Sequence, residues 1–174
     1  MFFLLILIPF NNLGAEINQG MKKILMVCLG NICRSPVAEG LMKHHALKQK
    51  LELVVASAGT SGWHEGETPD KRSAENALEH GIDIRKQRSR PVRKDDFTTF
   101  DLIFAMDQAN YDHLIEMAQP EQHAKIKMIL NEAHPGKNLP VPDPYYSTDG
   151  FEEVYQLINE ACNVIAQKLK NNEY

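Results

Sequence analysis

The feature that most constrains this chain is one loop motif with its two flanks, Val27-Cys28-Leu29-Gly30-Asn31-Ile32-Cys33-Arg34-Ser35-Pro36. The apolar run 24–27 before it is typical of a buried strand. Ser35 and Pro36 after it are typical of the N-cap and the first position of a helix. The sequence therefore predicts a strand, a tight loop and a helix N-terminus. Backbone N–H groups and the positive end of the helix dipole converge on such a loop, so it binds anions.

Cys28 and Arg34 bracket this loop and supply its chemistry. The converging amides favour the thiolate form of a cysteine at this place. Arg34 presents a planar fork of donors that matches two oxygens of a phosphate. Gly30 and Asn31 reach left-handed backbone angles at low cost, which turning N–H groups inward requires. We therefore predict that Cys28 is a nucleophile aimed at phosphorus, and the alternative is a small buried residue at a strand end.

These motifs resemble those of a known family. Cys28 to Pro36, together with Asp143-Pro144-Tyr145-Tyr146, resembles the low-molecular-weight protein tyrosine phosphatase family, and the resemblance covers most of the chain from Met21 to about Lys170. The Cys-x5-Arg-Ser core alone is shared by several phosphatase families. The resemblance implies a protein-tyrosine phosphatase that hydrolyses phosphotyrosine monoesters through a cysteinyl-phosphate intermediate. It implies no cofactor and no metal.

Apolar runs alternate with helical patterns along the rest of the chain. Further strands are expected at 51–57, 100–106 and 126–130, and helices at 35–47, about 69–80, after Asp107 and from about 149 onward. This alternation predicts an α/β fold with a parallel sheet and helices on both faces. The family resemblance implies four strands in the order 2-1-3-4, with the phosphate-binding loop after strand one.

Length and composition indicate one ordinary domain. The chain has 174 residues and a net charge of −4, which does not suggest nucleic-acid binding. Residues 1–20 are expected to be an apolar extension: a tail, a mis-assigned start or a weak signal peptide. Residues 21–174 are expected to form the phosphatase domain. The basic run 85–90, with Arg93 and Lys94, is interpreted as a solvated surface segment, and a partner-binding patch is the alternative.

Three cysteines, Cys28, Cys33 and Cys162, form neither a disulfide framework nor a paired zinc motif. A reduced, cytoplasmic protein fits this pattern, although the apolar start leaves export open. That start is too short to span a bilayer, and we expect no stable membrane association. Cys162 falls on the apolar face of the last helix and is expected in the core.

Expulsion of an alcohol-type oxygen needs a proton donor. Asp70, Asp107 and Asp143 stand on loops at expected strand ends. Asp107 is better explained as a helix N-cap and Asp70 as a first-turn helix residue. Asp143 has no predicted helix to cap, and Pro142 and Pro144 stiffen its loop. A polar turn residue is its alternative interpretation, and the family resemblance assigns it the acid role.

The remaining predicted site residues contact substrate or support the loop. Substrate contacts are expected from the loop and from aromatic residues on two flanking loops: Leu29, Gly30, Asn31, Ile32, Cys33, Ser35, Trp63, Tyr145 and Tyr146. Ser35 can also donate its hydroxyl to the sulfur. In the family, an Asn at the position of Asn31 bonds with residues that match Ser35, Ser57 and His80. Cys33 corresponds to a reversible disulfide partner of the nucleophile, and simple packing is its alternative.

Aromatic walls predict a deep pocket for a phenyl ring. Related enzymes that act on phosphoarginine carry Thr where this chain has Ile32, and they lack the Tyr pair, so Ile32 favours phosphotyrosine. The expected partners are a phosphotyrosine-containing protein or peptide, and phosphate or other oxyanions as product or inhibitors. The alternatives are a phosphoarginine phosphatase and a non-catalytic phosphotyrosine-binding module. A binding module needs no acid, so Asp143 argues against it.

Overall fold

The computed structural model describes residues 21–146 and 150–174, without the side chain of Tyr146. The predicted extension, residues 1–20, lies outside the described residues. The strands are β1 (Lys22–Cys28), β2 (Leu53–Gly59), β3 (Leu102–Ala105) and β4 (Ile126–Met128). The α-helices are α1 (Arg34–Gln49), α2 (Lys71–Glu79), α3 (Asp96–Thr99), α4 (Gln108–Met117) and α5 (Gly150–Lys170). Short 3-10 helices are η1 (Pro120–Lys125), η2 (Ile129–Asn131) and η3 (Pro144–Tyr146).

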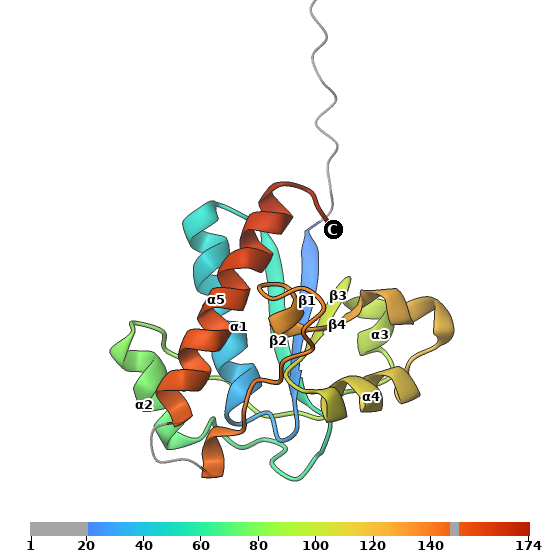
Figure 1. Ribbon diagram of the computed structural model, residues 1–174. Coiled ribbons are helices and arrows are strands. Elements are labelled where there is room, and N and C mark those ends of the chain that lie inside the picture. Colours follow the sequence, from blue (N-terminus) through green and yellow to red (C-terminus); the bar gives the residue numbers. More distant parts are fainter. Residues whose placement is uncertain (1–20, 147–149) are drawn as a thin grey trace, which may run out of the picture.

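The strands form one parallel sheet in the order β2-β1-β3-β4, as predicted. From β1 the chain crosses to β2 on one side, and it later returns to β3 on the other (Figure 1). Cys28, the last residue of β1, is in register with Gly59 at the end of β2. The loop after β1 therefore lies at the point where the strand order reverses, which is where open α/β sheets bind ligands.

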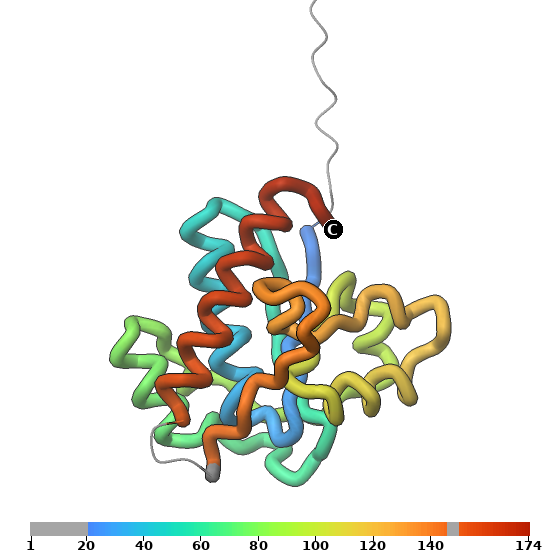
Figure 2. Tube along the Cα trace, in the orientation of Figure 1, coloured from blue at the N-terminus to red at the C-terminus, as the bar shows by residue number. Residues whose placement is uncertain are grey.

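Alternating residues of β1 face two hydrophobic clusters, one on each side of the sheet. Ile24 and Met26 belong to the cluster that includes buried residues of α1 and α5. Leu25 and Val27 belong to the cluster that includes residues of α3 and α4. The tube in Figure 2 shows α1 and α5 running together on one side of the sheet, and α4 on the other. Helices on both faces, as predicted, bury β1 from Ile24 to Cys28 and fix the start of the loop.

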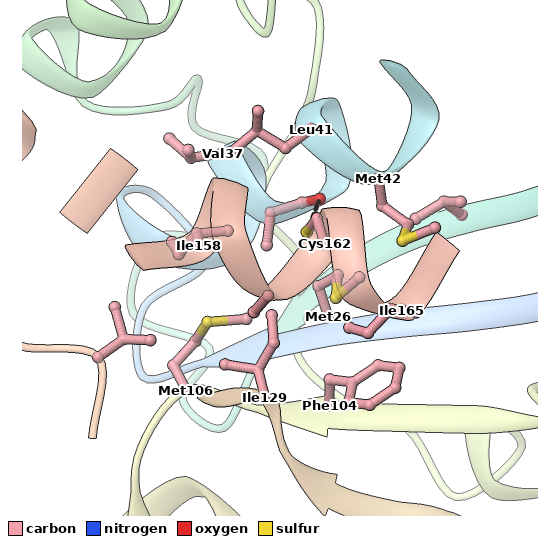
Figure 3. Close-up of a cluster of buried hydrophobic side chains, with 14 of the residues drawn as sticks. Met26, Val37, Leu41, Met42, Phe104, Met106, Ile129, Ile158, Cys162 and Ile165 are labelled. Carbon is pink, nitrogen blue, oxygen red and sulfur yellow. Dashed lines mark hydrogen bonds between the residues drawn. The ribbon is translucent and has the colours of Figure 1, made fainter. Parts of the chain in front are cut away.

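The larger cluster contains Cys162. Figure 3 shows its side chain on α5 among Val37, Leu41 and Ile158, with the sheet residues Met26 and Phe104 nearby. Its Sγ lies 3.7 Å from the carbonyl oxygen of Ala38 on α1, and the thiol is fully buried. Fully burying an apolar side chain of Ile or Leu size contributes about 1.5–3 kcal/mol. The predicted core position of Cys162 is confirmed.

Two helix starts differ from the sequence prediction. The helix α1 begins at Arg34, so Cys33 occupies the N-cap position, without a side-chain hydrogen bond, and Ser35 lies inside the helix. The helix α2 begins at Lys71, so Asp70 is its N-cap rather than a first-turn residue. The hydroxyl of Ser35 therefore does not cap α1 and instead lies beside the Cys28 sulfur, whereas the Asp70 carboxylate caps α2 through the N–H of Arg72. No helix in the described ranges is both long and apolar enough to cross a bilayer.

Candidate active site

Hydrogen bonds to its carbonyl oxygens hold the loop between β1 and α1. Three of these oxygens accept from other segments at 2.8–3.0 Å: Leu29 from the N–H of Ser61, Gly30 from the hydroxyl of Ser89, and Ile32 from the N–H of Asp70. A trans peptide directs its N–H away from its C=O. The next N–H groups, those of Gly30, Asn31 and Cys33, therefore point toward the inside of the loop. The N–H of Asn31 donates to the sulfur of Cys28 at 3.3 Å, as this geometry requires.

Asn31 is the conformational centre of the loop. Its φ is +53°, so the left-handed backbone predicted here is confirmed. Its side-chain amide donates to the hydroxyl of Ser35 at 2.9 Å and accepts from the N–H of Arg90 at 3.0 Å. Gly30 does not have a positive φ, and its lack of a side chain serves a close approach instead. A Cβ there would lie 3.1 Å from Cδ2 of His64.

Cys28 is 2% exposed, and its sulfur lies 3.1 Å from the hydroxyl oxygen of Ser35. The same hydroxyl is 3.3 Å from the carbonyl oxygen of Ala58, and it has only one proton to give. While Cys28 is a thiol, the S–H can donate to Ser35 and the Ser35 proton can go to Ala58. Once Cys28 is a thiolate, the Ser35 proton can turn to the sulfur. The geometry therefore fits the predicted role of Ser35 as a donor to the sulfur.

Arg34 is 4% exposed and is held by acceptors on two other loops. Its Nη1 donates to Oδ2 of Asp107 at 2.6 Å and to the carbonyl oxygen of Val141 at 3.1 Å. Asp107 also accepts from the N–H of Asn110 at 2.7 Å, which confirms it as the N-cap of α4. The remaining donors of Arg34 can then bind two oxygens of a phosphate.

Asp143 comes to the other side of Arg34. Its Oδ2 lies 3.5 Å from Nη2 of Arg34, and its side chain is 37% exposed. The expectation that Asp143 caps no helix is wrong, because η3 begins at the next residue and Asp143 Oδ1 accepts from the N–H of Tyr145 at 3.1 Å. One carboxylate oxygen thus fixes the loop while the other faces Arg34.

A pocket of about 220 Å³ opens between these groups, and it is lined by Leu29, Gly30, Ile32, Cys33, Arg34, Trp63, His64, Asp143 and Tyr145. Trp63 is 80% exposed and Tyr145 is 59% exposed, so both rings present open surface at its rim. The side chain of Tyr146 lies outside the described part of the chain. His64 was not predicted. It pairs through Nδ1 with Glu67 at 2.8 Å, and nothing in the sequence distinguishes it among seven histidines.

Two predicted support residues lie elsewhere. The hydroxyl of Ser57 donates to Glu39 of α1 at 2.6 Å rather than to Asn31. His80 pairs through Nε2 with Glu152 of α5 at 2.9 Å, and its ring stacks on a tyrosine of the same helix. The family pattern placed on His80 is therefore wrong for this chain, and only the Ser35 contact of Asn31 is found.

Ser89 and Arg90 support the loop instead. The guanidinium of Arg90 makes two bonds to the carboxylate of Asp96, at 2.8 and 3.0 Å, which fixes the backbone that bonds to Asn31. The interpretation of the run 85–90, with Arg93 and Lys94, as solvated is therefore wrong at Ser89 and Arg90, although Arg85 and Arg88 are exposed as expected. No sequence pattern marked Ser89 or Arg90, because their partners lie 59 residues away.

Cys33 lines the pocket as a neutral thiol. Burial is the main reason that its pKa rises to about 12, and the negative charge of Asp70 adds to this. All three cysteines are free and buried. In the described residues, no group of three His, Cys, Asp or Glu side chains could hold a metal ion.

Comparisons with known proteins agree with this geometry. The family model "Low molecular weight phosphotyrosine protein phosphatase" matches residues 23–174. A curated relative from Synechocystis, named as a putative low molecular weight protein-tyrosine-phosphatase, is 41% identical over 84% of this chain and 96% of its own length. A protein tyrosine phosphatase from Entamoeba histolytica, solved with Hepes in its active site, superposes with a TM-score of 0.83 at 38% identity, over 88% of this chain and 99% of that one.

A Drosophila arginine phosphatase is also similar, with a TM-score of 0.78 at 33% identity over 86% of this chain and 98% of that one. The fold therefore accommodates more than one substrate class. The match of the family model to nearly the whole chain, with the reactive loop at the end of β1, confirms the resemblance and the predicted enzyme class. The chain belongs to the low molecular weight phosphotyrosine protein phosphatase family.

Proposed function

We propose that this protein hydrolyses phosphotyrosine monoesters through a cysteinyl-phosphate intermediate, with Cys28 as nucleophile, Arg34 as phosphate ligand and Asp143 as proton donor. The observation that carries the proposal is a pocket lined by Arg34, Asp143 and the loop 29–34, with the buried Cys28 at the start of that loop. Asn31 N–H and the Ser35 hydroxyl lie within 3.3 Å of the Cys28 sulfur.

In the first step, the Cys28 thiolate attacks phosphorus, and the bond from phosphorus to the phenol oxygen breaks. The inward N–H groups of the loop and the fork of Arg34 bind the equatorial phosphate oxygens, where charge collects in the transition state. Asp143 gives its proton to the departing phenol oxygen. The 3.5 Å distance between its Oδ2 and Nη2 of Arg34 supports this role.

In the second step, water attacks phosphorus and the bond from sulfur to phosphorus breaks. Asp143, now a carboxylate, takes a proton from that water. The sulfur leaves as a thiolate, and the hydroxyl of Ser35 at 3.1 Å can donate to it as charge returns. Inorganic phosphate is the product, and other oxyanions of its shape are the expected inhibitors.

An aromatic phosphate fits this pocket better than phosphoarginine. Trp63 and Tyr145 present open ring surface at the rim, which favours stacking on a flat phenyl ring. Ile32 adds an apolar side chain to the lining of the pocket. A phosphotyrosine-containing protein or peptide is therefore the proposed substrate, and neither nucleic acid nor a membrane is proposed as a partner.

Cys33 is the proposed redox partner of Cys28. Both thiols belong to the same loop. If a peroxide oxidises Cys28 to the sulfenic acid, Cys33 can attack that sulfur and displace water, and the resulting disulfide would protect the nucleophile from over-oxidation. Burial raises the pKa of Cys33 to about 12, so its thiol must lose a proton before this sulfur can form the disulfide.

Three free, buried thiols suit a reducing compartment, so we propose that the protein is cytoplasmic. We also take residues 21–174 as the catalytic domain, since the family model matches 23–174.

The decisive experiment compares Cys28→Ser and Asp143→Asn with the wild-type enzyme, without added metal. Cys28→Ser should lose turnover and still bind inorganic phosphate. Asp143→Asn should slow the hydrolysis of a phosphotyrosine peptide by about 10²–10⁴-fold. It should slow the hydrolysis of p-nitrophenyl phosphate much less, because p-nitrophenolate leaves readily without a proton from an acid.

The same experiment separates the alternatives. Binding of a phosphotyrosine peptide without hydrolysis by the wild type would identify a binding module. Faster hydrolysis of phosphoarginine than of phosphotyrosine would identify an arginine phosphatase. If Asp143→Asn lowers the rate of hydrolysis of the phosphotyrosine peptide and of p-nitrophenyl phosphate by the same factor, Asp143 is not the proton donor.

A further inference from the structure

Arg72, in the first turn of α2, lies between two aromatic rings. Its Cζ is 5.1 Å from the ring centroid of Tyr145 and 4.6 Å from that of Phe151. Both distances are within the range of cation–π attraction. Tyr145 lines the active-site pocket, whereas Arg72 does not. Arg72 therefore contacts the outer side of a residue that forms the wall of the pocket.

Asp70 holds this guanidinium in place. Its Oδ1 accepts from Nε of Arg72 at 3.1 Å and its Oδ2 accepts from Nη2 at 2.9 Å, while Oδ1 also caps α2 through the N–H of Arg72. The side-chain hydrogen bond from Arg72 is the main reason that the pKa of Asp70 is lowered. A planar fork bound at two points presents its face in a fixed direction.

The same aspartate is tied to the reactive loop. The N–H of Asp70 donates to the carbonyl oxygen of Ile32 at 2.8 Å. A short chain of contacts therefore runs from Ile32 to Asp70, to Arg72 and to Tyr145. The N–H of Tyr145 in turn donates to the carboxylate of Asp143. The phosphate loop and the wall of the aryl site are thus linked from outside the pocket.

We propose that Arg72 is a positioning residue for the aryl group of the substrate: it holds the ring of Tyr145 at the distance from the phosphate loop that a phenyl phosphate requires. This inference rests on the proposed function. It predicts that loss of Arg72 weakens recognition of the ring and leaves recognition of the phosphate unchanged.

The chain contains a matched control. Arg85 forms the same fork with Asp83 two residues before it, with Nε at 2.9 Å from Oδ1 and Nη2 at 2.8 Å from Oδ2. Within the described ranges, the cation–π contacts involve Arg72 and Lys127 but not Arg85. Arg85→Ala therefore removes an equivalent ion pair, without the aromatic contact.

The experiment measures kcat/KM for a phosphotyrosine peptide and the inhibition constant of inorganic phosphate in wild type, Arg72→Ala and Arg85→Ala. Arg72→Ala should lower kcat/KM by about two- to fivefold, the factor expected for an exposed cation–π contact. The inhibition constant of phosphate should stay at the wild-type value in both variants, because phosphate has no ring. Arg85→Ala should leave kcat/KM unchanged.

A second pair of variants tests whether the effect passes through Tyr145. In a Tyr145→Ala background, Arg72→Ala should cause no further loss, since the ring that it holds is gone. An independent further loss, an equal weakening of phosphate inhibition, or the same loss in Arg85→Ala would each overturn the inference. If the wild-type enzyme itself fails to hydrolyse the peptide, the proposed function fails instead, and the two failures are distinguishable.

Discussion

Gly59 at the end of β2 touches the reactive loop so closely that no side chain fits. A Cβ at this position would lie 2.8 Å from the carbonyl oxygen of Leu29 and 2.9 Å from that of Ser61. Both obstacles are backbone atoms, and the carbonyl oxygen of Leu29 already accepts from the N–H of Ser61 at 2.9 Å. Neither can swing away as a flexible side chain would. Gly59→Ala must therefore displace the loop itself.

The size of the effect follows from these distances. A carbon normally stays about 3.3–3.6 Å from a carbonyl oxygen even in close contacts, so the backbone has to move by roughly 0.5 Å or more. Overpacking of this kind costs about 1–3 kcal/mol, and the reduced freedom of the unfolded chain returns about 0.4–1 kcal/mol. We expect a net loss of about 1–2 kcal/mol and, at about 2–4 °C per kcal/mol, a fall in Tm of roughly 2–8 °C.

Gly62→Ala is the control, because the nearest atom to a Cβ there is a proline carbon 3.9 Å away. Thermal denaturation of both variants gives the stability, and the inhibition constant of inorganic phosphate reports the shape of the loop. Gly59→Ala should weaken phosphate binding as well as stability, while Gly62→Ala should match the wild type in phosphate inhibition and be more stable by about 0.4–1 kcal/mol. A Gly59→Ala enzyme as stable and as tightly inhibited as Gly62→Ala would refute the reasoning.

Three further predictions concern buried polar groups. Ser35→Ala should slow hydrolysis of the phosphoenzyme about tenfold or more, the value of one hydrogen bond to a charged group, and rapid-quench kinetics should then show a larger phenol burst. Burial is the main reason that the pKa of His45 is lowered, and the neighbouring His44 and Lys48 add to this effect. The side-chain oxygen of Asn159, 2.8 Å from Nε2 of His45, opposes it. As the pH drops, His45 is therefore protonated in the unfolded chain before it is protonated in the folded one. The free energy of unfolding should fall below about pH 6.5, by at most about 1.4 kcal/mol per pH unit. Denaturation experiments on His45→Gln should show a shallower fall. Cys33 should resist iodoacetamide at pH 8 in the folded protein and react once unfolded, as mass spectrometry can measure, because burial raises its pKa to about 12.

Much of the reactive loop could be predicted from the sequence because its chemistry is local. Cys28 and Arg34 lie in one uninterrupted segment, and the strand and helix that flank it set the direction of the loop amides. The left-handed backbone of Asn31 also follows from the residue type. The sheet order needed more than the residues themselves, since local patterns show that strands exist and do not show which strands are neighbours.

The supporting contacts could not be predicted in this way. The side chain of Asn31 accepts a hydrogen bond from the N–H of Arg90, which lies 59 residues away in the sequence. The basic character of the segment around Arg90 predicted exposure to solvent rather than a backbone contact with the loop. His80 was placed beside the loop by family pattern, whereas its helix turns it toward Glu152. The ring of His64 lies where it would crowd any side chain at position 30, and this proximity leaves no periodic signal in the sequence. These contacts depend on tertiary packing, and periodicity cannot reveal it.

The position of Arg34 shows why the identity of that residue matters as well as its charge. Asp107 and the carbonyl oxygen of Val141 both bind Nη1, so the plane of the guanidinium is set before any phosphate arrives. These two acceptors belong to separate loops, one after β3 and one just before Asp143. A lysine has donors on one nitrogen only, and could not hold both acceptors and a pair of phosphate oxygens in one plane. The relative placement of the reactive loop, the loop after β3 and the loop before Asp143 therefore depends on the guanidinium of Arg34.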